Sequence, residues 1–256
     1  MLFDIAAQTL LRIAADPKHL GAHIGATLVL QDELAHYLGK VLRLRPGEQV
    51  ALFNGTDGEH LAVILQVDKR SVTVALTQRR ECQADPQLRI HLGLGLSRGE
   101  RMDYAVQKAT EAGVTSIVPL LTERCEVKLK ADRVDNRLGH LERIAISASE
   151  QSGRCSVPAV EQPATLQDWL ARTHAGACFV LDHRGAAGLQ AAVPPAEVTF
   201  MIGPEGGLAE HEVEAAVAAG FQTCRLGPRV LRTETAPVVA IALAQYLWGD
   251  LRQPDA

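Results

Sequence analysis

The sequence has few aromatic residues and no excess of positive charge. Aromatic side chains make up 4% of its 256 residues, and the formal net charge is −4. We therefore do not expect a platform of exposed aromatic rings to be its main device for holding nucleic-acid bases. Binding through bulk positive charge is also excluded, so any contact with nucleic acid must come from local basic patches and from shape.

Cysteine is sparse as well, and none of the five cysteines forms a C-x-x-C pair. A zinc cage is therefore improbable, and no metal site is predicted. The odd number of cysteines, without a secretion signal at the N-terminus, predicts free thiols in a reducing cytoplasm. No uninterrupted apolar run approaches the length of a membrane span. The hydrophobic content of 47% is nevertheless enough for a sizeable core, as in an ordinary soluble protein.

Residues 1–80 have the pattern of a small β-barrel. The predicted strands are short β-prone runs separated by turn residues, at 27–30, 49–53, 60–65 and 71–76. Between the first two strands, apolar residues at helical spacing predict one helix over 32–44. Lys40, Arg43 and Arg45 lie near the end of this helix. A solvated helix end and an RNA contact explain these cations equally well.

A polar, aperiodic stretch closes this part of the chain, and we place a linker at 81–87. From residue 88 to 256, strand-like runs alternate with helical ones. The strands are expected at 89–96, 116–121, 178–181, 198–202 and 224–226, and the helices from 102 to 113 and over 132–153, 210–219 and 236–247. Such alternation predicts an α/β domain with a parallel sheet covered by helices on both faces.

Three successive strands of this predicted sheet end in unusual segments, at 181–185, 202–207 and 226–236. Ligands of open parallel sheets bind at the carboxyl ends of the strands. The glycines of these segments allow bare amide and carbonyl groups to face a ligand, although a single such turn also serves as a tight strand-to-helix connection. Three of them at successive strand ends favour a binding pocket.

Other motifs for nucleotide binding and catalysis do not fit. The glycines of 93–99 have the spacing G-x-G-x-x-x-G, which is not the dinucleotide fingerprint. The segment 211–215 lacks the second histidine of a zinc-protease helix. There is no Walker A sequence and no serine in a G-x-S-x-G elbow. A nicotinamide enzyme, a zinc protease and a serine hydrolase are therefore not predicted.

The glycine-rich turns also carry a family resemblance. Ile202–Gly207 and Leu226–Ala236 closely resemble two motifs of the RsmE family of methyltransferases. Three further stretches, at 97–102, 107–114 and 150–154, agree with the same family. The resemblance covers nearly all of residues 34–251, and its first two motifs together are highly specific.

This resemblance implies a SPOUT-type enzyme that transfers a methyl group from S-adenosylmethionine to N3 of one uridine in 16S ribosomal RNA, in the decoding region of the small subunit. It implies a PUA-like RNA-binding domain (1–80), the linker (81–87) and a trefoil-knotted methyltransferase domain (88–256). It also implies a homodimer. The final predicted helix is apolar on more than one face, which fits either a dimer interface or a central core helix.

The resemblance implies which residues line the cofactor pocket, and the position and chemistry of the other side chains suggest the remaining roles. The cofactor pocket is expected to be lined by Leu181, Ile202, Gly203, Gly207, Leu226, Gly227 and Leu231. Arg232 is expected to stabilise negative charge on the uracil, and Glu234 to orient Arg232 or accept the proton. Glu205 is a third candidate, facing the sulfonium. RNA phosphates are expected to contact basic side chains, namely Lys40, Arg43, Arg98, Arg101, Arg124 and Arg154.

The sequence departs from the family pattern in two places. The family often opens with an arginine-containing segment that serves the RNA side, and here only Arg12 offers a comparable group. Position 209, usually a polar helix cap, is alanine. Two alternatives stay open: the same fold and cofactor acting on transfer RNA or another ribosomal site, and a non-catalytic RNA-binding assembly factor.

Overall fold

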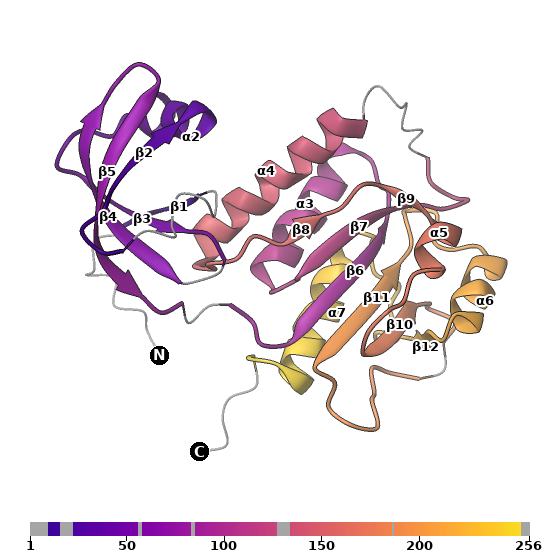
Figure 1. Cartoon of the computed structure of the whole chain (residues 1–256). Coiled ribbons are helices and arrows are strands. Elements are labelled where there is room, and N and C mark those ends of the chain that lie inside the picture. The colour runs from indigo at the N-terminus through magenta and orange to yellow at the C-terminus, as the bar shows by residue number, and fades with distance from the viewer. Residues whose placement is uncertain are drawn as a thin grey trace. The chain divides into compact units, whose positions relative to one another are not determined.

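The computed structural model describes residues 10–15, 23–55, 58–82, 85–126, 134–185 and 187–251. The chain divides into two compact units, which are described separately (Figure 1). Unit 1 contains residues 1–85 and 149–157, and unit 2 contains 86–148 and 158–256. The sequence does not reveal that 149–157 belong with the first unit. The domain limits at 80 and 88 stay a prediction.

Unit 1 is built on a five-stranded sheet with the order β1-β3-β4-β5-β2. Its strands are β1 (Leu11–Ala14), β2 (Thr27–Gln31), β3 (Gln49–Phe53), β4 (Glu59–Val67) and β5 (Ser71–Arg80). The β1–β3 pair is parallel and the other pairs are antiparallel, so the sheet is mixed. Alternate residues such as Leu30, Leu52 and Val74 are fully buried and form its core. The four predicted strands are confirmed, and β1 is additional.

The helix expected over 32–44 is shorter than predicted. It consists of α2 (Asp32–His36) and a π-helical turn, η1 (Tyr37–Val41). The Leu44 N–H donates to the carbonyl oxygen of Leu38 at 3.0 Å, which closes the helix. Arg43 has a φ of 56°, in the left-handed region that usually ends a helix at glycine. The chain therefore leaves the helix before the predicted end.

Unit 2 contains a seven-stranded sheet in which every pairing is parallel. Its strands are β6 (Arg89–Gly95), β7 (Ser116–Leu121), β8 (Ala159–Val160), β9 (Ala164–Thr165), β10 (Ala177–Leu181), β11 (Glu197–Ile202) and β12 (Gln222–Cys224). The order is β12-β10-β11-β6-β7-β8, with β9 also paired to β7. The parallel α/β prediction is confirmed, and the carboxyl ends of β10, β11 and β12 lie at one edge.

Helices pack on both faces of this sheet. They are α3 (Gly99–Glu111), α4 (Val134–Ser152), α5 (Leu166–Leu170), α6 (Glu210–Ala218) and α7 (Thr235–Trp248). Side chains of α3, α4 and α7 share a core with Phe200 of β11, whereas α5 and α6 share a second core with the next residue, Met201. Figure 1 shows α5 and α6 beside β10 and β12. The sequence does not predict α5, β8 or β9, which have five, two and two residues.

Two helix starts differ from the sequence interpretation. Ala209 cannot cap α6 with its side chain, but Glu212 accepts the Ala209 N–H at 2.8 Å and replaces part of the missing cap. Thr233 and Thr235 stand just before and at the start of α7, where a threonine often caps a helix, but the N-cap residue is Glu234 and no side-chain capping hydrogen bond forms. The Thr233 hydroxyl has another partner, described below.

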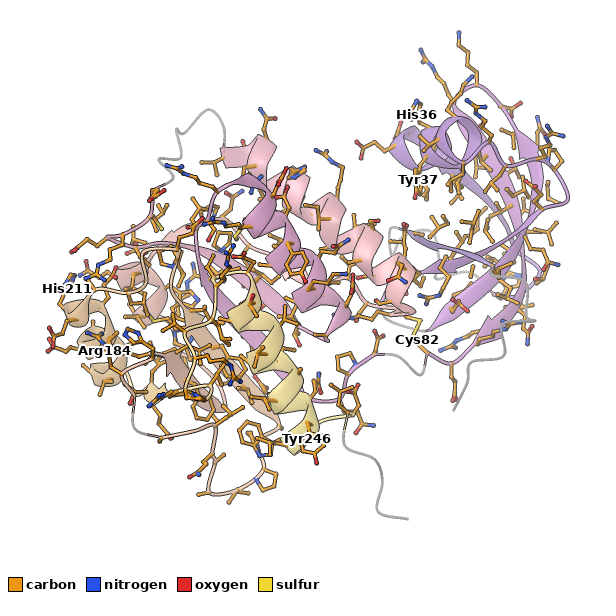
Figure 2. All side chains as sticks on the ribbon, turned by 180° about the vertical axis from the view of Figure 1, so that it is seen from behind. His36, Tyr37, Cys82, Arg184, His211 and Tyr246 are labelled. Carbon is orange, nitrogen blue, oxygen red and sulfur yellow. A yellow bond between two sulfur atoms is a disulfide. The ribbon has the colours of Figure 1, made fainter. Side chains whose placement is uncertain are left out.

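The prediction that all five cysteines are free thiols is wrong. Cys82 and Cys155 form a disulfide within unit 1, whereas Cys125, Cys178 and Cys224 are free (Figure 2). The bonded cysteines are 73 positions apart, so no spacing motif reveals the pair. Within the described ranges, no helix combines the length and the apolar character needed to cross a bilayer.

Candidate active site

A cavity of about 380 Å³ lies at the carboxyl ends of β10, β11 and β12. It is formed by the three strand-end segments that the sequence singles out. Six of the seven residues predicted to hold the cofactor line it: Leu181, Ile202, Gly203, Gly207, Leu226 and Leu231. Gly227 does not line the cavity, and instead occupies a left-handed turn with a φ of 79°. The three candidate catalytic residues, Glu205, Arg232 and Glu234, also line it.

Gly95 and Gly203 allow two of the loops to approach closely. A Cβ atom on Gly95 would lie 2.7 Å from the backbone carbon of Gly203, and closer still to the nitrogen of Pro204. A Cβ on Gly203 would lie 3.0 Å from backbone atoms of the turn that follows it. Gly207 has a φ of 69°, which favours glycine. Side chains at Gly95 and Gly203 would therefore push these loops apart, whereas Gly207 is required for its backbone conformation.

Two buried hydroxyl groups tie the loops together. The Thr233 hydroxyl donates to the carbonyl oxygen of Gly203 at 2.9 Å. The Ser97 hydroxyl lies 3.3 Å from that of Thr233 and 3.2 Å from the carbonyl oxygen of Gly95. Ser97 and Thr233 are 3% and 8% exposed, so water does not compete for these bonds. The segments after β6, β11 and β12 are therefore held in one arrangement.

Glu205 presents a charged oxygen at the cavity. Its Oε1 accepts the backbone N–H of Arg98 at 3.1 Å and lies 3.4 Å from Nη1 of Arg101. Burial raises the pKa of Glu205, but the N–H groups of its own backbone and of Arg98, together with the charge of Arg101, outweigh burial and lower it. Oε2 is buried with no hydrogen-bond partner among the described residues. The side chain is thus an ionised acceptor with one oxygen left for a ligand.

Asp182 fixes Arg184 at the cavity, and neither residue has a role predicted from the sequence. Asp182 Oδ1 accepts both the backbone N–H and Nε–H of Arg184 at 3.0 Å. Burial raises the pKa of Asp182, but the hydrogen bonds and charge of Arg184 lower it overall. The only signal in the sequence is an aspartate and an arginine two positions apart at the end of a strand.

Arg232 and Glu234 lie near each other, as predicted, but their ion pair is loose. Nη1 of Arg232 is 4.0 Å from Oε1 of Glu234. The arginine side chain is 78% exposed and the glutamate side chain 18%. Arg232 is therefore exposed at the cavity, whereas Glu234 is mostly buried at the start of α7.

The predicted RNA-binding residues fall into three groups: those at or near the cavity, those exposed on unit 1, and the buried Arg154. Arg101 and Arg124 line the cavity, and Arg98 is exposed nearby and pairs with Glu126 at 2.9 Å. Lys40 and Arg43 are exposed on unit 1.

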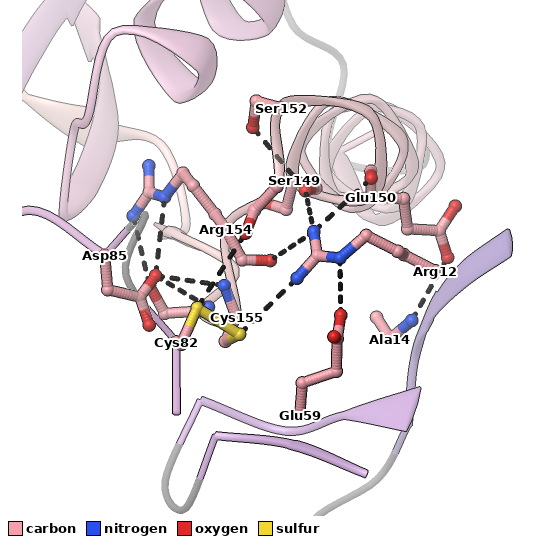
Figure 3. A network of polar contacts seen from close by, with 12 residues as sticks. Arg12, Ala14, Glu59, Cys82, Asp85, Ser149, Glu150, Ser152, Arg154 and Cys155 are labelled. Carbon is pink, nitrogen blue, oxygen red and sulfur yellow. Dashed lines mark hydrogen bonds and ion pairs between the residues drawn. A yellow bond between two sulfur atoms is a disulfide. The ribbon is translucent and has the colours of Figure 1, made fainter. Parts of the chain in front are cut away.

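Arg154 does not fit an RNA-binding role. It is 3% exposed, with Nε 4.0 Å from Oδ1 of Asp85 and Nη2 donating to Ser156 at 3.2 Å. A buried guanidinium cannot meet phosphates, so the structure argues against this prediction. Arg12 is also internal to unit 1: its Nε donates to Glu59 at 2.6 Å and its Nη1 to the carbonyl oxygen of Arg154 at 3.1 Å (Figure 3).

Known proteins match both units. A family model described as an RNA methyltransferase domain matches residues 84–245, and one described as an RNA methyltransferase PUA domain matches 30–77. Ribosomal RNA small subunit methyltransferase E of Buchnera aphidicola subsp. Schizaphis graminum is 32% identical over 230 residues, which cover 89% of this chain and 94% of the relative. This chain belongs to the ribosomal RNA small subunit methyltransferase E family. The resemblance drawn from the motifs is thereby confirmed.

Two further members of the methyltransferase E family support this assignment. The Bacillus subtilis protein is 28% identical over 86% of this chain and 90% of its own length. The crystal structure of the Neisseria gonorrhoeae protein, bound to S-adenosyl methionine, has 37% sequence identity and a TM-score of 0.86. It covers 94% of this chain and 99% of that one.

Proposed function

We propose that this chain methylates small-subunit ribosomal RNA, with S-adenosylmethionine as the methyl donor. The observation that carries the proposal is the cavity of about 380 Å³ lined by three strand-end segments. Its size falls in the range of pockets for small organic ligands. The relative from Neisseria gonorrhoeae that shares the fold was solved with this cofactor bound.

The residues at the cavity fit such a donor. Gly203 and Gly207 leave backbone groups uncovered, and the leucines at 181, 226 and 231 offer apolar contact for an adenine ring. Glu205 Oε2, buried and without a partner among the described residues, suits a cationic group. When bound, S-adenosylmethionine supplies an electrophilic methyl group on a positively charged sulfur.

The proposed target atom is N3 of a uridine, which must lose its proton to react. Arg232 would stabilise the negative charge that develops on the uracil oxygens. Glu234, 4.0 Å from Arg232, would orient that guanidinium or accept the N3 proton. Glu205 is less suited to accept the proton, because its pKa is lowered and its conjugate acid forms only under more acidic conditions. Its proposed role is to position the donor.

The remaining parts of the proposal concern assembly and RNA binding. Arg98, Arg101 and Arg124 near the cavity, with Lys40 and Arg43 on unit 1, would contact phosphates. The segments around the cavity would form the trefoil knot of a methyltransferase domain at 88–256. A linker at 81–87 and a PUA-like domain at 1–80 would precede it. A cytoplasmic location would follow from the substrate.

A homodimer is supported by apolar residues that α7 leaves uncovered. Leu243, Tyr246 and Leu247 are 38%, 61% and 39% exposed, whereas Ala240 and Ala244 on the same helix are fully buried. One face of α7 therefore packs in the core and another is available for a second copy. Light scattering at micromolar concentration tests this, and a monomer would contradict it.

The catalytic assignment is tested with Arg232→Ala and Arg232→Lys. We expect Arg232→Ala to lower single-turnover methyl transfer to small-subunit particles by roughly 10²-fold or more, with cofactor affinity unchanged. Arg232→Lys should retain part of the rate because it keeps the charge. Near-normal turnover of Arg232→Ala would show that the assigned role is wrong.

The pocket assignment is tested with Gly203→Val, measuring S-adenosylmethionine binding by calorimetry. We expect affinity to be lost, because a side chain at this position would meet backbone atoms at 3.0 Å. Gly188→Val is a matched control, since a Cβ there would have no neighbour within 4 Å. Intact affinity in Gly203→Val would overturn the assignment.

The substrate is tested by mapping methylated nucleotides after incubation with naked ribosomal RNA, purified small subunits and transfer RNA. Modification of uridine N3 in the small subunit supports the proposal. Modification of transfer RNA or of another ribosomal position would replace it with the first alternative. If calorimetry detects no binding of S-adenosylmethionine to the wild-type chain, the non-catalytic assembly factor becomes the better account.

A further inference from the structure

The Cys82–Cys155 disulfide joins two distant parts of unit 1. Cys82 follows β5, and Cys155 follows α4 in the short segment 149–157 that returns to the unit (Figures 1 and 3). Their Cα atoms are 6.0 Å apart, within the usual range for a disulfide. The bond therefore closes a loop over 73 positions of sequence.

The two cysteine residues differ in their exposure to solvent. Cys82 is partly exposed, whereas Cys155 is only 2% exposed. A small thiol or disulfide in solution can therefore reach Cys82 but not Cys155. This asymmetry divides the pair into an outer cysteine that meets an external reagent and an inner cysteine that resolves the resulting adduct.

Polar groups around Cys155 favour its reactive form. Nη2 of Arg12 lies 3.4 Å from Cys155 Sγ, where its positive charge would stabilise a thiolate. Asp85 accepts the backbone N–H groups of Cys155 and Ser156 at 3.1 and 3.0 Å. These bonds hold the Cys155 backbone in place and do not involve its sulfur atom (Figure 3). The arrangement around Cys155 does not depend on the disulfide alone.

Disulfides in reducing compartments are usually transient, and they form where a thiolate is stabilised and accessible. We propose that Cys82 and Cys155 form a reversible modification site that exchanges with low-molecular-weight disulfides and thiols. Formation of the Cys82–Cys155 bond then increases the stability of unit 1. This site is separate from the cavity at the strand ends, because neither cysteine lines it. The proposal takes only the reducing compartment from the proposed function.

The exchange runs in two balanced steps. The Cys82 thiolate attacks one sulfur of an external disulfide RSSR, forming a mixed disulfide and releasing RS⁻. The Cys155 thiolate then attacks Cys82 Sγ, forming the Cys82–Cys155 bond and releasing the second RS⁻. Overall the two protein thiols lose two electrons and two protons, and RSSR is reduced to two RSH. Excess thiol reverses both steps.

The bond is expected to stabilise unit 1 because it holds 149–157 on the sheet. Without it, this segment is retained by non-covalent contacts, including those of Arg12 and of Asp85. A disulfide that closes a long loop restricts the unfolded chain strongly. We expect reduction to lower the thermal unfolding midpoint by roughly 5–10 °C.

The test equilibrates the full chain with reduced and oxidised glutathione at a series of ratios. After acid quenching and alkylation, peptide mass spectrometry reports the state of each cysteine, and thermal unfolding is followed on parallel samples. We expect Cys82 and Cys155 to change state together and reversibly, with the midpoint rising as the bond forms. A pair that stays bonded, or stays free, at every ratio would overturn the proposal.

Single variants test the division of roles. Cys155→Ser should accumulate a glutathione adduct on Cys82, whereas Cys82→Ser should leave Cys155 unmodified because it is buried. Neither should show the midpoint shift. Cys178→Ser, which removes a free cysteine, should keep the full shift. Equal adduct formation on both single variants would show that the assigned roles are wrong.

A metal site is the competing account, because Cys82, Asp85 and Cys155 present ligand atoms within 4.8 Å of one another. The nearby guanidinium groups of Arg12 and Arg154 oppose a cation there. Titration of the reduced chain with Zn²⁺ should therefore show no stoichiometric binding that depends on Cys82. Tight one-to-one binding that Cys82→Ser abolishes would replace the redox proposal.

Discussion

The Thr233 hydroxyl donates a hydrogen bond of 2.9 Å to the carbonyl oxygen of Gly203. This bond joins the segment before α7 to the turn after β11, and both segments line the proposed cofactor cavity. Thr233 is 8% exposed, so the bond is shielded from water. The shape of the cavity therefore depends on the hydroxyl group of a residue that lies just before α7.

Thr233→Val should weaken both the fold and the cavity. It removes the donor and leaves the Gly203 carbonyl without this partner, which typically costs about 1–3 kcal/mol. We expect a lower midpoint in urea and weaker S-adenosylmethionine binding by calorimetry. Thr233→Ser, which keeps the hydroxyl, should restore most of both. Wild-type binding by Thr233→Val would show that the bond does not shape the cavity.

Gly95→Ala should be destabilising because the position is crowded by backbone. The added Cβ would lie 2.7 Å from the backbone carbon of Gly203, which cannot move as a flexible side chain can. We expect a loss of about 1–3 kcal/mol in chemical denaturation. Gly139→Ala in α4 is the matched control: with no neighbour within 4 Å, it should stabilise the helix by about 0.5–1 kcal/mol. Equal effects of the two variants would contradict the crowding.

The sequence predicted most of the long elements because their periodicity is strong. The strand over Ser116–Leu121 has the predicted bounds, and the helix expected over 236–247 differs from α7 by one residue at each end. The three strand-end segments were also predicted to meet, since parallel strands bring their carboxyl ends to one edge. The periodicity of apolar residues predicts the long strands and helices. The alternation of strands and helices along the chain predicts that the strand-end segments meet.

Other features depend on contacts that no local pattern records. The disulfide joins cysteines 73 positions apart, and the return of 149–157 to unit 1 is a tertiary event. Arg154 resembles an exposed basic residue in sequence, yet it is buried beside Asp85. Arg43, two residues after the end of η1, has a left-handed conformation that usually favours glycine, so helical spacing overestimates the length of that helix.

Glu205 should make stability depend on acidic pH in a defined direction. Its pKa is lowered in the folded chain, so the ionised form stabilises the fold above the unfolded value of about 4.3. This contribution is lost as the pH falls through the lower folded value. The stability difference between wild type and Glu205→Gln should thus be constant near neutrality and shrink below about pH 4.3. Urea denaturation between neutral and strongly acidic pH measures it, and a difference that grows on acidification would contradict the assignment.

Arg154→Ala should act on the fold and not on the charge dependence of RNA binding. The guanidinium is 3% exposed and lies beside Asp85 and Ser156, so its removal takes away a buried side chain together with these two polar contacts. We expect unit 1 to lose about 1–3 kcal/mol of stability in chemical denaturation. Arg98→Ala is the matched control, because that side chain is 71% exposed. It should leave stability nearly unchanged.

The two variants should separate in the salt dependence of RNA affinity. Each phosphate contact that is lost lowers the slope of log affinity against log salt by about 0.9 for duplex nucleic acid and about 0.7 for single strands. Arg98→Ala should reduce the slope by roughly this amount if Arg98 meets a phosphate. Arg154→Ala, measured at a temperature where it remains folded, should keep the wild-type slope because its charge never reaches the surface. A reduced slope with unaltered stability in Arg154→Ala would restore its assignment to RNA binding, since only a side chain that turns out of the unit could produce both results.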